Sequence, residues 1–341
     1  MAAESKQIRD EWLETDLGKL STWERRHAAD LRAFEDNPDD PGEVWYGDDA
    51  HEQQLEFLFD LVERSAGEGW EGAALDPKTS HLCDLGCGNA LFAVDAVKHG
   101  WVHCVAMDYS TESMLLSTAV VRHAAEEMAE GGGSDGSGSG SDSEAGAGGG
   151  GGAGAGGAGA GGGGGGGGAG GATDSAGDAA GDAAGAGEDR APFKEQLWKP
   201  VAGGGPFSHL HLMQTDIYAS PLTPGRFHVI AEKGLLDASQ LNPDALPVRA
   251  YADAMVRLLV PGGLFIITSG NWTVDELVAD LGPRLQYVDH VAYPEMLFGG
   301  RAGATKATVA FRAVKSDDSD DGGDGSDGSD GGCSSDGGDG A

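Results

Sequence analysis

The chain has 341 residues, 60 glycines and a formal net charge of −34 at pH 7. Because phosphate contacts need clustered Lys and Arg, this charge balance argues against direct binding of nucleic acid. The sequence has no run of about 18 apolar residues, so we expect no membrane-spanning helix, and the charged N-terminal segment predicts no secretory signal peptide.

Two compositionally biased segments carry part of the acidity. Residues 131–190 are mainly Gly, Ala, Ser and Asp, and residues 316–341 are Gly, Ser and Asp with a single cysteine. Neither segment has enough apolar surface to offset the entropy of ordering it, so we predict a disordered insertion and a disordered tail. They hold 17 of the 56 acidic side chains and one of the 22 basic ones, which leaves −18 on the rest. That body suits a small molecule or a basic protein as partner.

Helical and strand patterns follow one another along the chain. Amphipathic helices are predicted at 21–34 and 50–64, with a turn-rich break at 37–42. Strands are predicted at about 80–85, 101–107, 207–214, 226–232, 262–269, 285–292 and 304–314, and helices at about 90–99, 111–129, 245–260 and 272–281.

The alternation of strands and helices predicts an α/β fold: a Rossmann-like, mainly parallel sheet of seven strands. The last two strands have no helix between them, so we expect an antiparallel hairpin at the sheet's end. The predicted parts are an N-terminal helical extension over 1–48, one domain over 49–315 that contains the insertion, and the tail. In such sheets the ligand site lies at the carboxyl ends of the strands.

A glycine turn follows the first strand of this alternation, in the run Asp84-Leu-Gly-Cys-Gly-Asn89. Glycines at 86 and 88 let the backbone approach a ligand closely, and the N–H groups of the next helix suit a carboxylate. An acid two residues before Gly-x-Gly is typical of sites that hold S-adenosylmethionine. Leu91 stands where a dinucleotide fingerprint has its third glycine, which excludes that alternative. A tight turn without ligand remains the structural alternative.

Two further acids follow predicted strands. Asp108 lies 22 residues after Gly86, at the distance where an acid binds ribose hydroxyls, although it could instead cap the next helix. Asp216 follows the third strand and could meet an adenine amine, or could simply form a turn. Cys83, Cys87 and Cys104 form no C-x-x-C pair and predict free thiols in a reducing compartment, with no metal site.

Several blocks together resemble the seven-strand methyltransferases that modify a lysine of elongation factor 1-alpha, the yeast Efm4-like group. The blocks are STWERRHAADLRAF (21–34), EVWYG (43–47), DLGCGNALF (84–92), MDYS (107–110), EKGLLDASQLNPD (232–244), ITSGNWTVDEL (267–277) and FGGRAG (298–303). Ala90 replaces the glycine usual in the family, and Glu232 and Leu235 replace the Asp and Thr of its Asp-Lys-Gly-Thr motif.

The resemblance implies a protein-lysine N-methyltransferase that uses S-adenosyl-L-methionine and acts on elongation factor 1-alpha, as a cytoplasmic monomer with the nucleus as a second location. The cofactor residues that it implies are Trp45, Tyr46, Gly47, Asp84, Gly86, Gly88, Asn89, Asp108, Tyr109, Asp216 and Ile217. Glu232 and Asp237 would orient the target lysine, and Asn271 and Trp272 would shape its channel, although the last pair also fits a helix cap and a packed aromatic. A small-molecule methyltransferase and a non-catalytic interaction protein are the alternative functions.

Overall fold

The computed structural model describes residues 16–131, 196–198, 205–242, 244–294, 296–298 and 301–314. The predicted insertion at 131–190 lies outside these residues, apart from Gly131 at the end of a helix. The predicted tail at 316–341 also lies outside them. Along the described residues, no helix is both long and apolar enough to cross a membrane.

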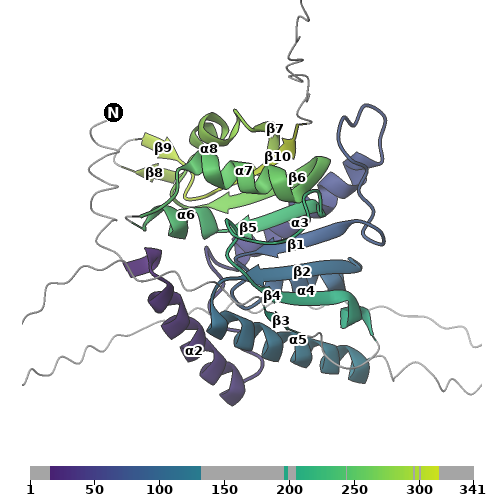
Figure 1. Cartoon of the computed structure of the whole chain (residues 1–341), viewed down its shortest axis with the longest axis vertical. Coiled ribbons are helices and arrows are strands. Elements are labelled where there is room, and N and C mark those ends of the chain that lie inside the picture. Colours follow the sequence, from purple (N-terminus) through teal and green to yellow (C-terminus); the bar gives the residue numbers. More distant parts are fainter. Residues whose placement is uncertain are drawn as a thin grey trace, which may run out of the picture. The chain divides into compact units, whose positions relative to one another are not determined.

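The central sheet has the strand order β3-β4-β2-β1-β5-β6-β10-β7 (Figure 1). Its strands are β1 (His81–Leu85), β2 (His103–Asp108), β3 (Gln196–Trp198), β4 (Leu210–Gln214), β5 (Phe227–Lys233), β6 (Leu259–Ser269), β7 (Leu285–His290) and β10 (Ala307–Ala313). β4, β2, β1, β5 and β6 pair in parallel, whereas β10 is antiparallel to both β6 and β7. The predicted mainly parallel sheet with an antiparallel end is therefore confirmed.

Period-two alternation in the strands builds two cores, one on each face of the sheet. On β1, Leu82 belongs to one buried cluster and Cys83 to the other, and on β5 Val229 and Ile230 divide in the same way. The helices are α2 (Leu20–Asp36), α3 (Asp48–Ser65), α4 (Leu91–Lys98), α5 (Thr111–Gly131), α6 (Leu235–Gln240), α7 (Val248–Leu258) and α8 (Val274–Leu281). α3, α4 and α5 cover the first face, and α6, α7 and α8 cover the second (Figure 1).

Short elements account for the differences from the predicted secondary structure. The strand expected at 207–214 begins with a 3-10 turn, η2 (Pro206–His209), which Pro206 initiates. A second 3-10 turn, η1 (Asp16–Gly18), precedes α2. The connection between the last two strands of the sheet forms its own small hairpin of β8 (Met296–Phe298) and β9 (Arg301–Gly303). Three-residue strands such as these and β3 are too short to give a recognisable period.

The N-terminal helix is fixed to the sheet's first face by polar and aromatic contacts with α5. Glu24 accepts hydrogen bonds from the N–H groups of Thr111 (2.8 Å) and Glu112 (3.2 Å), at the start of α5. Farther along, the rings of Phe34 and His123 meet edge to face at 5.7 Å. A carboxylate at a helix N-terminus is favourable, so α2 is held over the end of α5 that follows β2.

Four histidines form a row across the amino ends of neighbouring strands. His81 is paired in register with His103, and their rings stack at 4.9 Å with 16° between their planes. The row continues to His228 at 6.1 Å on one side of His81, and to His209 at 5.4 Å from His103 on the other. Because these residues begin parallel strands or directly precede them, the row lies at the end of the sheet opposite the glycine turn.

Candidate functional site

The glycine turn after β1 has the backbone geometry that the sequence predicts. Gly86 and Gly88 have φ of 66° and 55°, which glycine adopts without Cβ strain. The N–H groups of Gly86 (2.7 Å) and Cys87 (3.0 Å) both donate to the carbonyl of Met107 on β2. The turn is therefore anchored to the neighbouring strand, at the carboxyl edge of the sheet.

The helix that follows this turn does not present the free N-terminus that the sequence analysis expects. Asp84 accepts a hydrogen bond from the N–H of Ala93 (3.2 Å), and Asn89 accepts one from the N–H of Leu91 (3.2 Å). Two of the first three N–H groups of α4 are thus already bonded to side chains, and binding of a carboxylate at this helix start stays a prediction. Burial raises the pKa of Asp84 to about 6.

Asp108 ends β2 and joins two backbone segments. Its carboxylate accepts from the N–H of Gly88 (3.0 Å) and from the N–H of Ser110 (2.9 Å). The cap of α5 is supplied instead by Ser110, whose Oγ accepts from the N–H of Ser113 (3.0 Å). Asp108 therefore lies beside the glycine turn and next to the half-buried Tyr109, but neither residue lines the pocket, and their role toward the ribose stays a prediction.

The predicted adenine-side residues follow β4 at the same edge of the sheet. Asp216 accepts a hydrogen bond from the N–H of Tyr218 (2.9 Å), which is the turn that the sequence analysis gives as its alternative role. Ile217 is buried in the second core. Neither residue lines the pocket at the glycine turn, and their role toward adenine stays a prediction.

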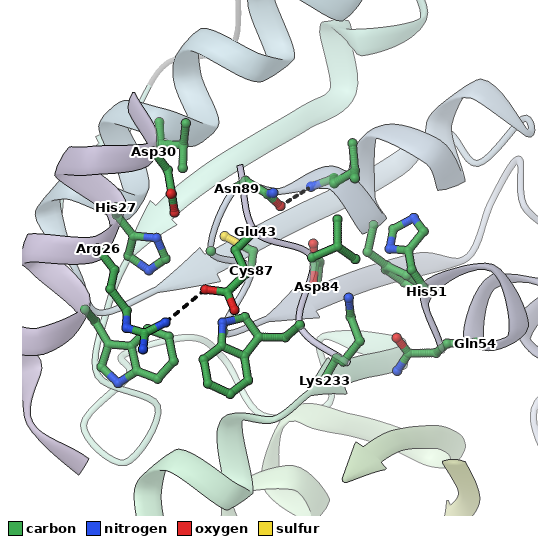
Figure 2. Close-up of a pocket in the computed structure, with 18 residues that line it drawn as sticks. Arg26, His27, Asp30, Glu43, His51, Gln54, Asp84, Cys87, Asn89 and Lys233 are labelled. Atoms are coloured by element: carbon green, nitrogen blue, oxygen red, sulfur yellow. Dashed lines mark hydrogen bonds and ion pairs between the residues drawn. The ribbon is translucent and has the colours of Figure 1, made fainter. Parts of the chain in front are cut away.

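A pocket lies between the N-terminal segment and the glycine turn (Figure 2). From the N-terminal side it is lined by Trp23, Arg26, His27, Asp30, Glu43 and Trp45, among others. From the body of the domain the lining includes His51, Asp84, Gly86, Gly88, Asn89 and Lys233. Five of the predicted cofactor residues are in this lining, namely Trp45, Asp84, Gly86, Gly88 and Asn89.

Aromatic rings and one arginine cover the N-terminal side of the pocket. The rings of Trp23 and Trp45 approach to 5.0 Å, and the Arg26 guanidinium lies 5.9 Å and 5.8 Å from their centres. Arg26 also donates to Glu43 (2.9 Å), so its charge is paired as well as stacked. His27 is buried here, and its Nδ1 has no hydrogen-bond partner within the described part of the chain.

Lys233 is a pocket residue that the sequence analysis does not identify. It is the last residue of β5, and Figure 2 shows its side chain pointing toward Asp84. Burial lowers the pKa of Lys233 to about 8, although Asp84 and Asp48 act in the opposite direction. In the sequence, Lys233 is a cation directly after a predicted strand, at the edge of the sheet where ligands bind.

Glu232, the neighbour of Lys233, faces the other side of the sheet, as strand alternation requires. One carboxylate oxygen accepts from the N–H of Leu235 (2.8 Å), and burial raises the pKa of Glu232 well above its usual value. Its second oxygen and the hydroxyl of Tyr251 have no hydrogen-bond partner among the described residues. Glu232 is absent from the pocket lining, and its predicted contact with a target lysine stays a prediction.

Asp237 is the acceptor for three donors from two distant segments. Its carboxylate receives hydrogen bonds from the hydroxyl of Tyr46, from Oγ of Ser269 (2.6 Å) and from the N–H of Gly270 (2.8 Å). Tyr46 has φ of 63° and is followed by Gly47 at 81°. This left-handed pair makes the sharp turn that brings the Tyr46 ring to the loop after β6.

The loop after β6 is organised by Ser269. Its Oγ accepts from the N–H groups of Asn271 (3.1 Å) and Trp272 (3.0 Å). Asn271 is exposed, whereas Trp272 is half-buried against the second core. The cap of α8 is Thr273, which forms a capping box with Glu276, so the alternative in which Asn271 caps the helix is wrong.

Away from the pocket, one group of side chains brings possible metal ligands together. Ligand atoms of Asp39, His123 and Glu127 lie within 4.8 Å of one another, on the surface of α5 and the loop after α2. No metal is predicted for this chain from its cysteine and histidine spacing, and that stays a prediction.

No model of a known protein family matches the chain. Two solved structures that resemble it are a TehB-like SAM-dependent methyltransferase from Corynebacterium glutamicum and magnesium protoporphyrin IX methyltransferase from Synechocystis, each 10% identical with a TM-score of 0.37. They cover 78% and 91% of this chain, and 100% and 97% of the solved chains.

Curated relatives match nearly the whole chain. EEF1A lysine methyltransferase 2 of Mus musculus is 23% identical, over 90% of this chain and 87% of its own length. Protein-lysine N-methyltransferase EFM4 of Saccharomyces cerevisiae is 26% identical, over 86% and 93%. The counterpart in Schizosaccharomyces pombe is 22% identical, over 87% and 93%. The predicted resemblance is therefore confirmed, and the chain is a relative of the EEF1A lysine methyltransferases of the Efm4 group along most of its length.

Proposed function

We propose that the chain is an S-adenosyl-L-methionine-dependent protein-lysine N-methyltransferase that methylates elongation factor 1-alpha. The observation that carries the proposal is the glycine turn at the carboxyl end of β1, which opens into a pocket covered by the N-terminal segment. The mouse and yeast relatives match this chain over most of its length. Their names support a lysine as the methylated residue and elongation factor 1-alpha as the protein that contains it.

The pocket suits the amino-acid end of this cofactor. The left-handed Gly86 and Gly88 leave room for close backbone approach, and the pocket wall holds a carboxylate, Asp84, and a cation, Lys233. The buried Nδ1 of His27 is a polar atom without a partner among described residues, as a ligand-binding atom would be. When bound, S-adenosyl-L-methionine supplies an electrophilic methyl group on a sulfonium.

Four of the remaining predicted cofactor residues lie at the same edge of the sheet, outside the pocket lining. Asp108 ends β2 and Tyr109 follows it, and Asp216 and Ile217 follow β4. We propose that Asp108 takes the ribose hydroxyls and that the residues after β4 meet the adenine. Carboxylate acceptors suit hydroxyl and amine donors, and neighbouring strand ends place them along one line.

A target lysine must reach the methyl group as a neutral amine, although its ordinary pKa is about 10.4. Removing the amine from water lowers that pKa, and aromatic walls provide such an environment. We propose that the channel runs beside Tyr46 and the loop of Asn271 and Trp272, which Asp237 and Ser269 hold together. Alignment of the amine with the methyl then supplies several kcal/mol of the acceleration.

The charge of the body supports a basic protein partner. With both biased segments set aside, the chain still carries a net charge of −18, which attracts a basic surface over long range. We propose that the protein acts in the cytoplasm, that residues 1–48 form the cofactor-covering extension, and that residues 49–315 form the methyltransferase domain.

The test is a transfer assay with the full chain, labelled S-adenosylmethionine and purified elongation factor 1-alpha. We expect label on a lysine of the factor, and much less of it, at a cofactor concentration near the parent's Kd, when Asp108→Ala replaces the parent chain. Asp60→Ala, on the exposed surface of α3, is the matched control and should act normally. Label on components of a metabolite extract, with none on the factor, would favour a small-molecule methyltransferase. Failure to bind the cofactor in calorimetry would favour the non-catalytic interaction protein.

A further inference from the structure

The ammonium of Lys233 is an unpaired cation inside the pocket. Within the described part of the chain it makes no hydrogen bond and no ion pair at bonding distance. Its position is nonetheless mostly withdrawn from water, at the end of β5 and against Gln54 and Asp84 in the pocket wall (Figure 2). A charge that is removed from water and has no hydrogen-bonded partner is energetically unfavourable. An anion bound beside Lys233 would therefore be stabilising.

Asp84, the acid that acts most strongly on Lys233, does not fill that role. Asp84 turns one carboxylate oxygen toward the N–H of Ala93 at 3.2 Å, and it attracts Lys233 only through space. His51, also in the pocket wall, bonds instead to Asp95 at 2.8 Å. His51 is therefore engaged elsewhere, Asp84 has one carboxylate oxygen bonded to the backbone, and the ammonium of Lys233 faces the cavity.

The usual alternative for an anion at this edge, a helix N-terminus, is partly occupied by side chains. The N–H groups of Leu91 and Ala93 at the start of α4 are bonded to Asn89 and Asp84. A carboxylate that enters the pocket can therefore meet the ammonium of Lys233, whereas an ammonium can meet the second carboxylate oxygen of Asp84. The two side chains present the complement of an amino-acid zwitterion.

We propose that Lys233 binds the α-carboxylate of the amino-acid part of S-adenosylmethionine, with Asp84 on the ammonium side. The proposal rests on the proposed function, because it takes that cofactor as the occupant of the pocket. It makes Lys233 a cofactor-binding residue and separates it from its neighbour Glu232, which faces the opposite core. The lysine's lowered pKa fits this role, since an anion that arrives would restore its charged form.

Calorimetry on the full chain with two ligands tests the assignment. S-adenosylmethionine carries the carboxylate, and decarboxylated S-adenosylmethionine keeps the sulfonium and ammonium but lacks it. For Lys233→Met we expect a loss of about 10- to 100-fold in affinity for the first ligand, as for a charged hydrogen bond, and less than a twofold change for the second. Lys233→Arg should retain most of the affinity, and Lys98→Met, an exposed lysine on α4, should match the parent.

A second measurement uses protons rather than affinity. Before the cofactor binds, Lys233 has a pKa of about 8 and is partly neutral at pH 8.5. Binding of the carboxylate should therefore draw a proton from the buffer. The cofactor's α-amino group, with an ordinary pKa near 8, also gains a proton when it binds Asp84, so titrations in two buffers of different ionisation enthalpy should report a smaller uptake in Lys233→Met than in the parent. Thermal unfolding of each variant checks that it is folded.

The outcomes separate the two proposals. If the parent binds S-adenosylmethionine and Lys233→Met binds both ligands as well as the parent does, the carboxylate assignment is overturned while the proposed function stands. Equal weakening for both ligands also overturns it, as does normal binding with lost turnover, which would make Lys233 a proton acceptor. If the folded parent does not bind the cofactor, the proposed function fails first.

Discussion

The hydroxyl of Tyr46 donates to the carboxylate of Asp237, although the two residues are 191 positions apart in sequence. Asp237 also accepts hydrogen bonds from Ser269 and Gly270. Segments from the N-terminus, from α6 and from the end of β6 therefore meet at one carboxylate. Three of the sequence blocks that carry the family resemblance thus form one network. This explains why they occur together in a chain whose glycine turn alone would identify only a cofactor class.

Removal of the Tyr46 hydroxyl tests this network. Tyr46→Phe leaves a buried carboxylate with one donor fewer, so we expect a loss of about 1–3 kcal/mol in the free energy of unfolding. Denaturant titration measures it. Tyr287→Phe, which removes an exposed hydroxyl bonded to His290, should cost much less. Equal effects of the two variants would contradict a special role for the Asp237 contact.

Gly270→Ala probes the same junction through packing. A Cβ at this position would lie 2.7 Å from Cε1 of Tyr46, so the ring must move. We expect about 1–3 kcal/mol of destabilisation, as for other overpacked sites. In a Tyr46→Ala background the same substitution should be nearly neutral, because the obstructing ring is gone. A double-mutant cycle measured by denaturation gives this coupling, and simple additivity would refute the packing explanation.

Asp108→Ala should weaken binding of the cofactor by tenfold or more. The substitution removes the predicted ribose acceptor, and it also releases the N–H of Gly88 from its place in the glycine turn. Hydrogen bonds to charged groups contribute about 1.5–3 kcal/mol each, which sets this expectation. Calorimetry with S-adenosylhomocysteine is the measurement, and Asp60→Ala is the control. Unchanged affinity would show that the end of β2 does not bind the ribose.

The histidine row predicts a stability that falls as the pH is lowered. Within the row, burial lowers the pKa values of His81 and His228, with further lowering of the first by Arg226 and neighbouring imidazoles. The unfolded chain then binds more protons than the folded one near pH 6, so stability decreases as the pH drops through the ordinary histidine pKa of about 6.5. His81→Gln should flatten this dependence between pH 7.5 and 5.5.

The difference between variant and parent isolates the histidines. Asp84 has the opposite effect, because its folded pKa of about 6 lies above that of the unfolded chain, so the folded state binds the extra proton. Denaturant midpoints at each pH, for the parent and for His81→Gln, provide the comparison. A parallel shift of both curves, with no change in slope, would exclude the row as the source of acid sensitivity.

Much of the fold could be predicted from local pattern. The strands at 81–85 and 103–108 are apolar runs bounded by turns, and buried parallel strands have that signature. β3 and α6 could not be predicted, because three and six residues give too little period. The place of β10 between β6 and β7 also depends on contacts between distant segments that no local window contains.

The candidate site was predicted unevenly, for a physical reason. Asp84, Gly86 and Gly88 follow a strand directly, so their positions at the carboxyl edge follow from chain order. Lys233 does as well, but a strand that ends in Glu-Lys presents its two side chains to opposite faces, and sequence does not say which face holds the pocket. The position of the N-terminal segment, which covers one of the two faces, determines which of the two side chains lines the pocket.

The position of β10 has a consequence for synthesis of the chain. This strand, Ala307–Ala313, is hydrogen-bonded on one side to β6 and on the other to β7, yet of the strands in the described residues it is the last to be made. Until those residues leave the ribosome, β7 has no neighbour in the sheet and β6 has an open edge. The nascent protein must therefore carry two unpaired edges until nearly all of its domain has been translated, which is when chaperone binding would matter most.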